Sequence, residues 1–335
     1  MNKLKEIREM KNYTPKEAAR ILQVRLDSYL QMEAGAFDDN DDLKGLIPDL
    51  EEKLKKNKPP KLPTFSQPIF LSPAIGKGGT GKTSSVISLA GALSENFQVL
   101  IVDCTEQVDA TMAFLSNEEL QGAETIYDAM DKVDDIRNYI MHTANPMIDI
   151  VPSDYRLDDV ESFLARKLNK DQVLRACFRP LVEENMYDFV LIDVSNHLGS
   201  FADVIWMASQ TMYLYMIIRP KTFDLSQFAR TKERIDEKSS EMSIYGNRLI
   251  NIGIFLNEVN MQAASADATI EALKNLVGDL YIDEYIRRDE NINHSQTYKR
   301  PITKYKPSSR ASKDYFKLAD EIVRRIERYE NGKEK

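Results

Sequence analysis

The chain has 335 residues, of which 42% are hydrophobic and 29% are charged, as in an ordinary globular protein that buries a core. This composition excludes a disordered chain, a collagen-like repeat and a disulfide scaffold, and the two cysteines, Cys104 and Cys177, favour a reducing cytoplasm. The formal net charge of −8 argues weakly against nucleic acid wrapped around the whole surface, although it allows a local basic patch. The charged first ten residues predict no signal peptide, and the apolar runs are too short to span a bilayer.

Two stretches precede the main part of the chain. Residues 1–36 predict short helices. Residues 37–65 hold an acidic run, one helix near 43–57 and then a segment rich in proline and lysine. Because prolines at that density have no apolar surface to pack against, we expect residues 37–65 to be a linker with a helix in it.

From residue 66 to about residue 330, apolar runs of strand length alternate with amphipathic segments of helix length. The runs are continuously apolar, which is typical of parallel strands covered on both faces. This pattern predicts a doubly wound α/β domain with a mostly parallel sheet, followed by a tail over 331–335. The expected strands are Val99–Val102, Ile148–Val151, Phe189–Ile192, Tyr213–Ile218 and Ile250–Leu256.

A phosphate-binding loop opens this domain. Residues 76–83 read Gly-Lys-Gly-Gly-Thr-Gly-Lys-Thr and match the P-loop pattern G-x-x-x-x-G-K-[ST] in full, which predicts a fold of P-loop NTPase type. The glycines let successive N–H groups converge on phosphate oxygens, and a helix expected over 84–93 adds its positive amino end. We expect Lys82 to reach the β- and γ-phosphates and the Thr83 hydroxyl to hold Mg²⁺. The ATP-binding candidates are Gly78, Gly79, Thr80, Gly81, Lys82, Thr83 and Ser84.

Pro73 lies close to what should be the central strand before this loop. A proline removes one hydrogen-bond donor from a sheet, so we expect that strand to be short or bulged.

Two carboxylates end apolar strands of the same domain. Asp103 follows the run 99–102, and Asp193 follows the run 189–192 in the Walker B pattern. A carboxylate at the carboxyl end of a strand beside a phosphate loop can hold Mg²⁺ directly or through water. We therefore expect Asp193 to be a metal ligand and Asp103 to belong to the catalytic site, rather than to solvated turns.

Lys77 precedes Lys82 by five positions in the run Lys-Gly-Gly-Thr-Gly-Lys-Thr-Ser. This run resembles the deviant Walker A motif of the ParA/MinD family of ATPases, and weaker likenesses follow in the family's order over roughly 68–330. The segments concerned are 99–107, 125–128, 150–153, 187–193, 286–288, 301–302 and 305–309. The resemblance implies an ATP-sandwich homodimer in which Lys77 reaches the partner's nucleotide and acts in catalysis. The resemblance also implies that Asn257, which follows the strand 250–256, contacts the purine. The alternative is that Asn257 belongs to an ordinary turn at the end of that strand.

The chain departs from this family at Thr105. The family's second motif carries an aspartate there that positions the attacking water, and a hydroxyl cannot do this through a full negative charge. Glu106 is the next residue and could take over the catalytic role, although neighbouring side chains diverge in direction. We therefore expect ATP hydrolysis that is slow, dependent on a partner, or lost.

The first 36 residues resemble a Cro/repressor-type helix-turn-helix. In that arrangement Thr14 caps the first helix, and the positions that pack the two helices are Ala18, Ala19, Leu22 and Val24. The second helix then presents Arg25, Asp27, Ser28 and Gln31 to a DNA major groove. Since residues 1–36 carry only a small positive net charge, dimerisation or docking of a partner stays open as their role.

The region 286–317 is basic, with nine Lys or Arg residues against three Asp or Glu residues. In an acidic protein this asymmetry favours contact with DNA phosphates irrespective of sequence, and the candidates are Arg287, Arg288 and Lys306. A solvated basic face is the alternative. The segment 314–329 predicts an amphipathic helix that packs into the core rather than onto a membrane, because the residues after it carry no bulky apolar side chains.

Together these features predict a ParA-like ATPase of plasmid or chromosome partition, with ATP and Mg²⁺ as cofactors. ATP-dependent homodimerisation and DNA binding would be reset by hydrolysis that a ParB-like adaptor stimulates. The alternative, which Thr105 keeps open, is an ATP-binding but hydrolysis-defective transcriptional regulator. A MinD-like positioning factor at the membrane is less favoured. We expect a cytoplasmic protein associated with the nucleoid.

Overall fold

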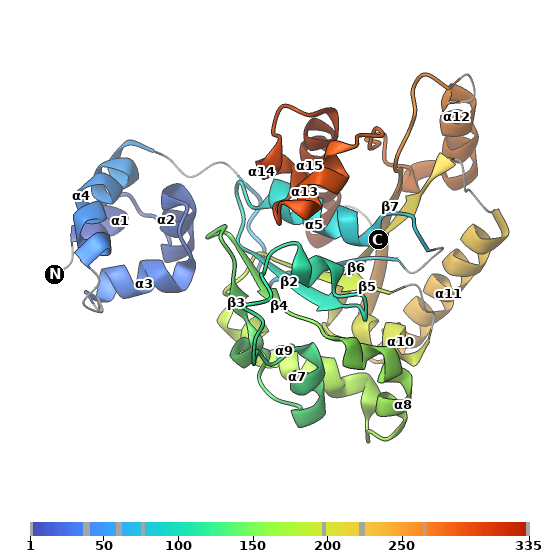
Figure 1. Ribbon diagram of the computed structural model, residues 1–335, viewed down its shortest axis with the longest axis horizontal. Helices are drawn as coiled ribbons and strands as arrows, with labels where there is room; N and C mark the ends of the chain where they lie inside the picture. Colours follow the sequence, from blue (N-terminus) through green and yellow to red (C-terminus); the bar gives the residue numbers. More distant parts are fainter. Residues whose placement is uncertain are drawn as a thin grey trace.

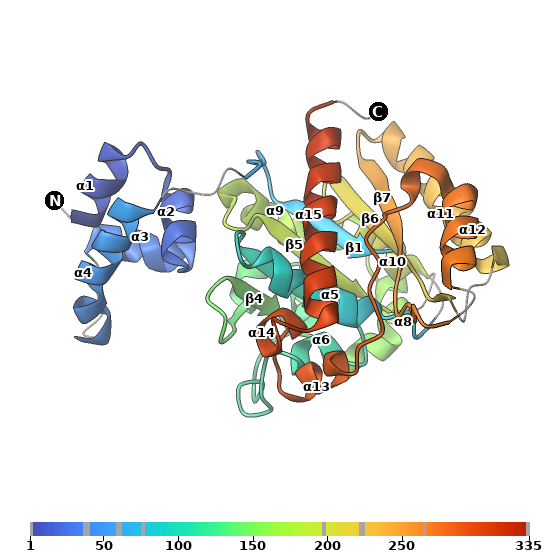
Figure 2. The same cartoon turned by 90° about the horizontal axis from the view of Figure 1, so that it is seen from above.

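The computed structural model describes residues 3–35, 41–57, 62–74, 78–195, 199–220, 225–263 and 266–332. Within these residues the chain forms a small helical module, residues 3–57, and a larger α/β body that begins at the first strand (Figure 1). Figure 2 shows the module lying beside the body, with the long C-terminal helix crossing one face of the sheet.

The body is built on one seven-stranded sheet in the order β3-β4-β2-β5-β1-β6-β7. The strands are β1 (Ile69–Pro73), β2 (Val99–Cys104), β3 (Met141–His142), β4 (Ile148–Val151), β5 (Phe189–Val194), β6 (Thr211–Ile218) and β7 (Arg248–Leu256). All neighbouring pairs are parallel except that of β3 with β4. The expected doubly wound sheet and its five expected strands are confirmed, whereas β3 is too short to leave an apolar run in the sequence.

Helices cover both faces of this sheet. One group is α5 (Lys82–Leu93), α6 (Asp109–Met112), α13 (Asn291–Thr297), α14 (Ile302–Tyr305) and α15 (Arg310–Glu330). The other is α7 (Ile126–Lys132), α8 (Val160–Ala165), α9 (Val173–Glu184), α10 (Ser200–Trp206), α11 (Leu225–Ile244) and α12 (Ala266–Val277). Short 3₁₀ helices lie at Ile136–Tyr139, Tyr155–Asp159, Lys170–Gln172 and Gly278–Leu280. Leu71 and Leu191 pack with the first group, and Phe70 and Val190 with the second, so each strand is buried on both sides.

Pro73 is the last residue of the central strand β1. The pairing of β1 with β5 stops at Leu71, whereas its pairing with β6 continues to Pro73. The hydroxyl of Ser72 donates a hydrogen bond of 3.0 Å to the carbonyl of Ile192 on β5. A side-chain donor thus satisfies a carbonyl at the point where the proline offers no N–H, and the expectation of a short strand is confirmed.

The module consists of α1 (Lys3–Met10), α2 (Pro15–Leu22), α3 (Leu26–Ala34) and α4 (Asp41–Lys56). Thr14 caps α2 as expected. Its hydroxyl accepts a hydrogen bond of 3.2 Å from the N–H of Glu17, whose carboxylate accepts one of 2.7 Å from the N–H of Thr14. Gln23, at φ 58°, ends α2 and begins the short turn to α3.

α4, the helix expected within the segment 37–65, packs within the module, whereas residues 37–40 and 58–61 of the expected linker lie outside the described residues. Leu54 of α4 is fully buried in one apolar cluster with Leu4, Ala18 and Tyr29 from the other three helices. This cluster buries apolar surface that three short helices alone would leave exposed. The helix expected near 43–57 is therefore present, but it is a fourth helix of the module.

The C-terminal helix α15 packs into the body, as the sequence predicts. Its buried side includes Ala319, Ile322, Val323 and Ile326, and it contacts α5 and β7. Among the residues that the structure describes, no helix combines the length and apolarity needed to span a bilayer.

Candidate nucleotide-binding site

The phosphate loop connects β1 to α5. Gly76 and Lys77 lie outside the described residues, and with them the lysine that the family resemblance assigns to the partner's nucleotide. The described part turns through two left-handed glycines, Gly79 at φ 74° and Gly81 at φ 93°. A Cβ on Gly81 would stand 2.4 Å from Nδ2 of Asn257. Conformation and crowding together therefore require glycine at position 81.

Residues from two neighbouring strand ends brace this loop. Asn257, directly after β7, donates from Nδ2 to the carbonyl of Thr80 at 2.8 Å, and its Oδ1 accepts the N–H of Glu258 at 2.9 Å. Arg219, directly beyond β6, donates to the carbonyl of Gly79 and pairs with Glu258. The contacts of Asn257 are thus made to the loop, and its expected purine contact stays a prediction.

Arg219 and Glu258 were not found by the sequence analysis. The signal available for them is position, because both follow the carboxyl ends of parallel strands, β6 and β7. Open α/β sheets bind their ligands along this edge.

Lys82, Thr83 and Asp193 meet at the amino end of α5. Lys82 is 7% exposed. Burial lowers the pKa of its ammonium group, while the charges of Asp193 and Glu106 act in the opposite direction. The Thr83 side chain hydrogen-bonds the Asp193 carboxylate, which lowers the pKa of Asp193 in part. The fold thus brings together the three groups expected to serve the phosphates and Mg²⁺.

Asp103 is fully buried and accepts four hydrogen bonds. Its Oδ1 accepts the N–H and the hydroxyl of Thr105 at 3.0 and 2.7 Å, and its Oδ2 accepts those of Thr111 at 2.9 and 2.8 Å. Two carboxylate oxygens offer about four acceptor sites. The expected catalytic role of Asp103 stays a prediction. With its acceptors used, Asp103 positions the loop between β2 and α6, and Thr111 is a further residue that the sequence did not single out.

Asp193 lies opposite Asp103 on the neighbouring strand, β5. Burial and the charge of Asp103 raise the pKa of Asp193 to about 8. Its Oδ1 accepts the N–H of Val194 at 3.0 Å, whereas its Oδ2 is buried without a hydrogen-bond partner among the described residues. An uncompensated carboxylate oxygen beside the Thr83 hydroxyl fits a hard cation such as Mg²⁺, which prefers oxygen ligands. The residues present thus fit Mg²⁺, which Thr83 and Asp193 would hold.

The remaining catalytic candidate, Glu106, is partly exposed, and its charge acts on Lys82. Thr105 is only 4% exposed, and its hydroxyl is donated to Asp103. The negative charge that this loop directs at Lys82 therefore belongs to Glu106. Ser84, an expected ATP contact, accepts a hydrogen bond of 3.0 Å from Nε2 of Gln296 and so connects α5 with α13.

The three DNA-binding candidates of the module have different surroundings. The guanidinium of Arg25 donates to Oδ1 of Asp149 and to the carbonyl of Thr143, both at 2.9 Å and both in the body. The N–H of Ser28 donates to the Asp27 carboxylate, and Gln31 is exposed. In this conformation the charge of Arg25 is directed at the body, and its expected DNA contact stays a prediction.

The basic candidates near the C-terminus also divide. Arg287 forms a bidentate pair with Asp314, from Nε to Oδ2 at 2.9 Å and from Nη2 to Oδ1 at 2.7 Å. Its charge is thus paired within the fold, and its expected DNA contact stays a prediction. Lys306 is exposed and donates to Oδ1 of Asn291 at 3.2 Å. Arg288 is exposed and lines a pocket of about 410 Å³ together with Arg310. We call the exposed cations Arg288, Lys306 and Arg310 the basic face.

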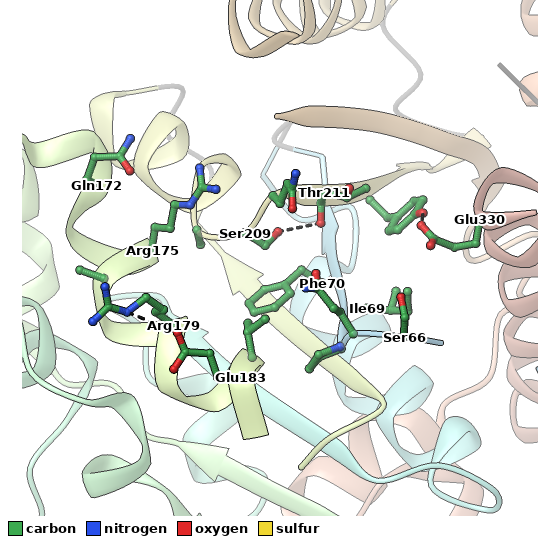
Figure 3. A pocket seen from close by; sticks show the side chains of 17 residues that line it. Ser66, Ile69, Phe70, Gln172, Arg175, Arg179, Glu183, Ser209, Thr211 and Glu330 are labelled. Carbon is green, nitrogen blue, oxygen red and sulfur yellow. Dashed lines mark hydrogen bonds and ion pairs between the residues drawn. The ribbon is translucent and has the colours of Figure 1, made fainter. Parts of the chain in front are cut away.

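Another pocket, of about 520 Å³, lies at the opposite end of the strands (Figure 3). It is lined by the beginnings of β1 and β6 and by α9, with Phe70, Thr211 and Arg175 among its residues. The Arg175 side chain donates to Oδ1 of Asn247 at 2.7 Å. None of the nucleotide candidates is among the residues that line this pocket.

Comparison with known proteins gives the chain its relatives. The AAA domain family model AAA_31 matches residues 71–244, just over half of the chain. The virulence plasmid ParA family protein pGP5-D of Chlamydia psittaci is 25% identical over 255 residues, which cover 75% of this chain and 92% of the relative. The chromosome partitioning protein ParA of Caulobacter vibrioides is 24% identical over 257 residues, which cover 76% and 94%.

Among solved structures, an ATP complex of a McdA variant from Cyanothece is similar, with a TM-score of 0.65 at 20% identity over 76% of this chain and 96% of that one. At this identity the likeness concerns the fold. It agrees with the parallel sheet and with the phosphate loop between β1 and α5. The chain therefore belongs to the AAA domain family AAA_31 and has the P-loop ATPase fold of the ParA/MinD type.

Proposed function

We propose that the protein is a ParA-like partition ATPase whose ATP- and Mg²⁺-dependent homodimer binds DNA. The observation that carries this proposal is the buried Oδ2 of Asp193, which has no hydrogen-bond partner among the described residues and lies beside Thr83 and Lys82. A buried carboxylate in this state is costly unless a cation compensates it. Relatives named ParA support the partition role.

Each part of the site has a task in this proposal. The N–H groups of the phosphate loop and the Lys82 ammonium bind the phosphates, while Asn257 and Arg219 hold the loop in shape. Bound Mg²⁺ would neutralise phosphate charge, and Thr83 and Asp193 would hold it. Asp103 keeps the loop that carries Glu106 in place through Thr105 and Thr111.

Dimerisation is proposed to depend on Lys77, because the family resemblance directs it across the interface to the partner's phosphates. The γ-phosphate adds negative charge for this lysine, so ATP and not ADP would join the two copies. Light scattering with ATP and with ADP tests this. We expect Lys77→Ala to bind ATP as a monomer, Lys82→Ala to lose ATP binding, and the exposed-lysine control Lys55→Ala to behave as the native chain. An ATP-dependent dimer of normal affinity in Lys77→Ala would contradict the sandwich.

A second candidate function is an ATP-binding regulator that does not hydrolyse ATP. The engagement of Thr105 with Asp103 favours it, because this hydroxyl is directed at the protein and not at a water in the site. Phosphate release measured with and without DNA, and with the product of the neighbouring gene, separates the candidates. Stimulated release supports partition, and its absence under all conditions supports the regulator.

The module is proposed to recognise specific DNA. α2 and α3 are joined by the short turn 23–25, as in helix-turn-helix proteins. The basic face of Arg288, Lys306 and Arg310 would instead contact DNA phosphates irrespective of sequence.

A further inference from the structure

The body carries an acidic surface on which α2 of the module is seated. We call it the docking surface; it consists of Glu95, Phe97, Gln98, Thr143, Asp149 and Asp188. Oδ1 of Asp188 accepts a hydrogen bond from Nη2 of Arg20 at 2.5 Å and lies 2.9 Å from Nζ of Lys16. The Arg20 guanidinium also lies over the ring of Phe97, 5.3 Å from its centre. With side chains 7% and 5% exposed, Arg20 and Asp188 form a buried ion pair.

The turn between α2 and α3 is seated on the same surface. Nε2 of Gln98 donates to the carbonyl of Val24 at 2.8 Å, and Nε2 of Gln23 donates to the carbonyl of Glu95 at 3.1 Å. Arg25, which precedes α3, continues the contact through Asp149. Lys16 and Arg20 of α2, the turn, and Arg25 at the N-cap of α3 therefore contact the body.

Charge complementarity explains why this side of the module contacts the body. Three cations of the module, Lys16, Arg20 and Arg25, meet two buried carboxylates of the body, Asp149 and Asp188. In helix-turn-helix proteins the beginning of the second helix enters the major groove, and cations around it contact phosphates. The cations of the module that would face phosphates are thus paired with carboxylates of the body in this structure.

We propose that the docking surface replaces DNA as the ligand of the helix-turn-helix, so that the module engages either the body or a duplex and never both. This inference rests on the proposed role of the module in recognising specific DNA. It predicts that specific binding requires the module to leave the docking surface, whereas phosphate contacts by the C-terminal basic face do not.

The first arm of the test locks the docked state in the full-length chain. Gln23→Cys with Glu95→Cys places two thiols across the contact for a short bis-maleimide cross-linker. The native Cys104 and Cys177 are buried, and burial raises the pKa of both thiols, so they add little background. We expect an intramolecular cross-link. A matched control with Lys5→Cys, on the exposed side of α1, and Glu95→Cys should not form one.

The second arm weakens docking without changing any residue of the module. In Asp149→Asn with Asp188→Asn, both side chains keep an acceptor but lose their charge. A random-sequence duplex pool is selected on this variant, and the enriched duplex is then the probe for all proteins. We expect it to bind the variant roughly tenfold or more tightly than the native chain, because apparent affinity scales with the open fraction. Asp158→Asn with Asp320→Asn changes the net charge equally at exposed sites of the body and should give no such gain.

These measurements are made without nucleotide. The proposal is supported if the cross-linked protein loses binding to the enriched duplex and the same variant without cross-linker keeps it. It is overturned if the cross-linked protein binds that duplex as tightly as the uncross-linked one, or if the pool enriches no sequence. The partition function fails separately, through the absence of an ATP-dependent dimer, so the two failures are distinguishable.

Discussion

The hydroxyl of Thr105 donates a hydrogen bond of 2.7 Å to Oδ1 of Asp103. Both residues are buried at the end of β2. Thr105, where the family resemblance places a water-positioning aspartate, thus holds a carboxylate in place. Substitutions at Thr105 can therefore test whether ATP hydrolysis is limited by the lack of a carboxylate at this position.

We expect Thr105→Asp to raise the rate of phosphate release about tenfold or more, because a positioned base typically contributes ~10²–10⁴-fold. The same change should lower the melting temperature of the nucleotide-free protein, since it adds a third carboxylate beside Asp103 and Asp193. Thr105→Ser keeps the hydroxyl and is the control for both measurements. If Thr105→Asp changes nothing and Glu106→Gln removes the activity, Glu106 holds the role.

Gly81 and Gly246 form a matched pair for the crowding of the phosphate loop. Both have a positive φ, of 93° and 72°, but a Cβ on Gly246 would meet no atom within 4 Å. Gly246→Ala should lower the free energy of unfolding by about 1 kcal/mol. Gly81→Ala should lower it by about 2–4 kcal/mol, because Asn257 must also move, and should weaken ATP binding. Urea unfolding and calorimetry check this, and equal losses at both sites would refute the crowding argument.

His142 gives the stability a dependence on pH. Its Nδ1 lies 2.9 Å from Oδ1 of Asp149, and this hydrogen bond raises the pKa of the imidazole above its usual 6.5. Because the imidazole pKa is higher in the folded state, protonated His142 adds to the free energy of unfolding. This contribution is fully present below the pKa of the unfolded state, and it is lost as the pH rises through the pKa of the folded state. The free energy of unfolding should therefore be larger for the native chain than for the His142→Gln variant at about pH 5.5, and this difference should disappear by about pH 8.5. Urea titrations at both values measure it, and a constant difference would contradict it.

Arg287 and Arg288 are neighbours with different expected roles. The logarithm of the binding constant for random duplex falls linearly with the logarithm of the salt concentration. Arg288→Gln should make this slope shallower by up to about 0.9, without changing the free energy of unfolding. Arg287→Gln should cost about 1–3 kcal/mol of unfolding free energy, because the largely buried Asp314 loses its partner. Salt titrations and thermal unfolding of both variants separate these effects. The reverse pattern would return Arg287 to the DNA-binding face.

Local chemistry and periodicity predicted the parts of the site that depend on neighbours in sequence. The phosphate loop, the strands that carry Asp103 and Asp193 near their carboxyl ends, and the apolar side of α15 needed only a glycine pattern, continuous apolar runs and a helical period. These signals are strong because a parallel strand buried on both faces and an amphipathic helix each restrict every position that they occupy.

Which groups the charged side chains contact was decided by the tertiary structure alone. Arg20 and Asp188 are 168 positions apart, and Arg25 and Asp149 are 124 apart, so no local pattern relates them. The sequence shows that Arg25 and Arg287 are cations, but a cation can meet a phosphate or a carboxylate equally well by charge. Which of the two it meets depends on the surface that folding brings within about 3 Å. The sequence thus determined which groups could bind a nucleotide or DNA, and the packing of distant segments determined which of them are already used inside the protein.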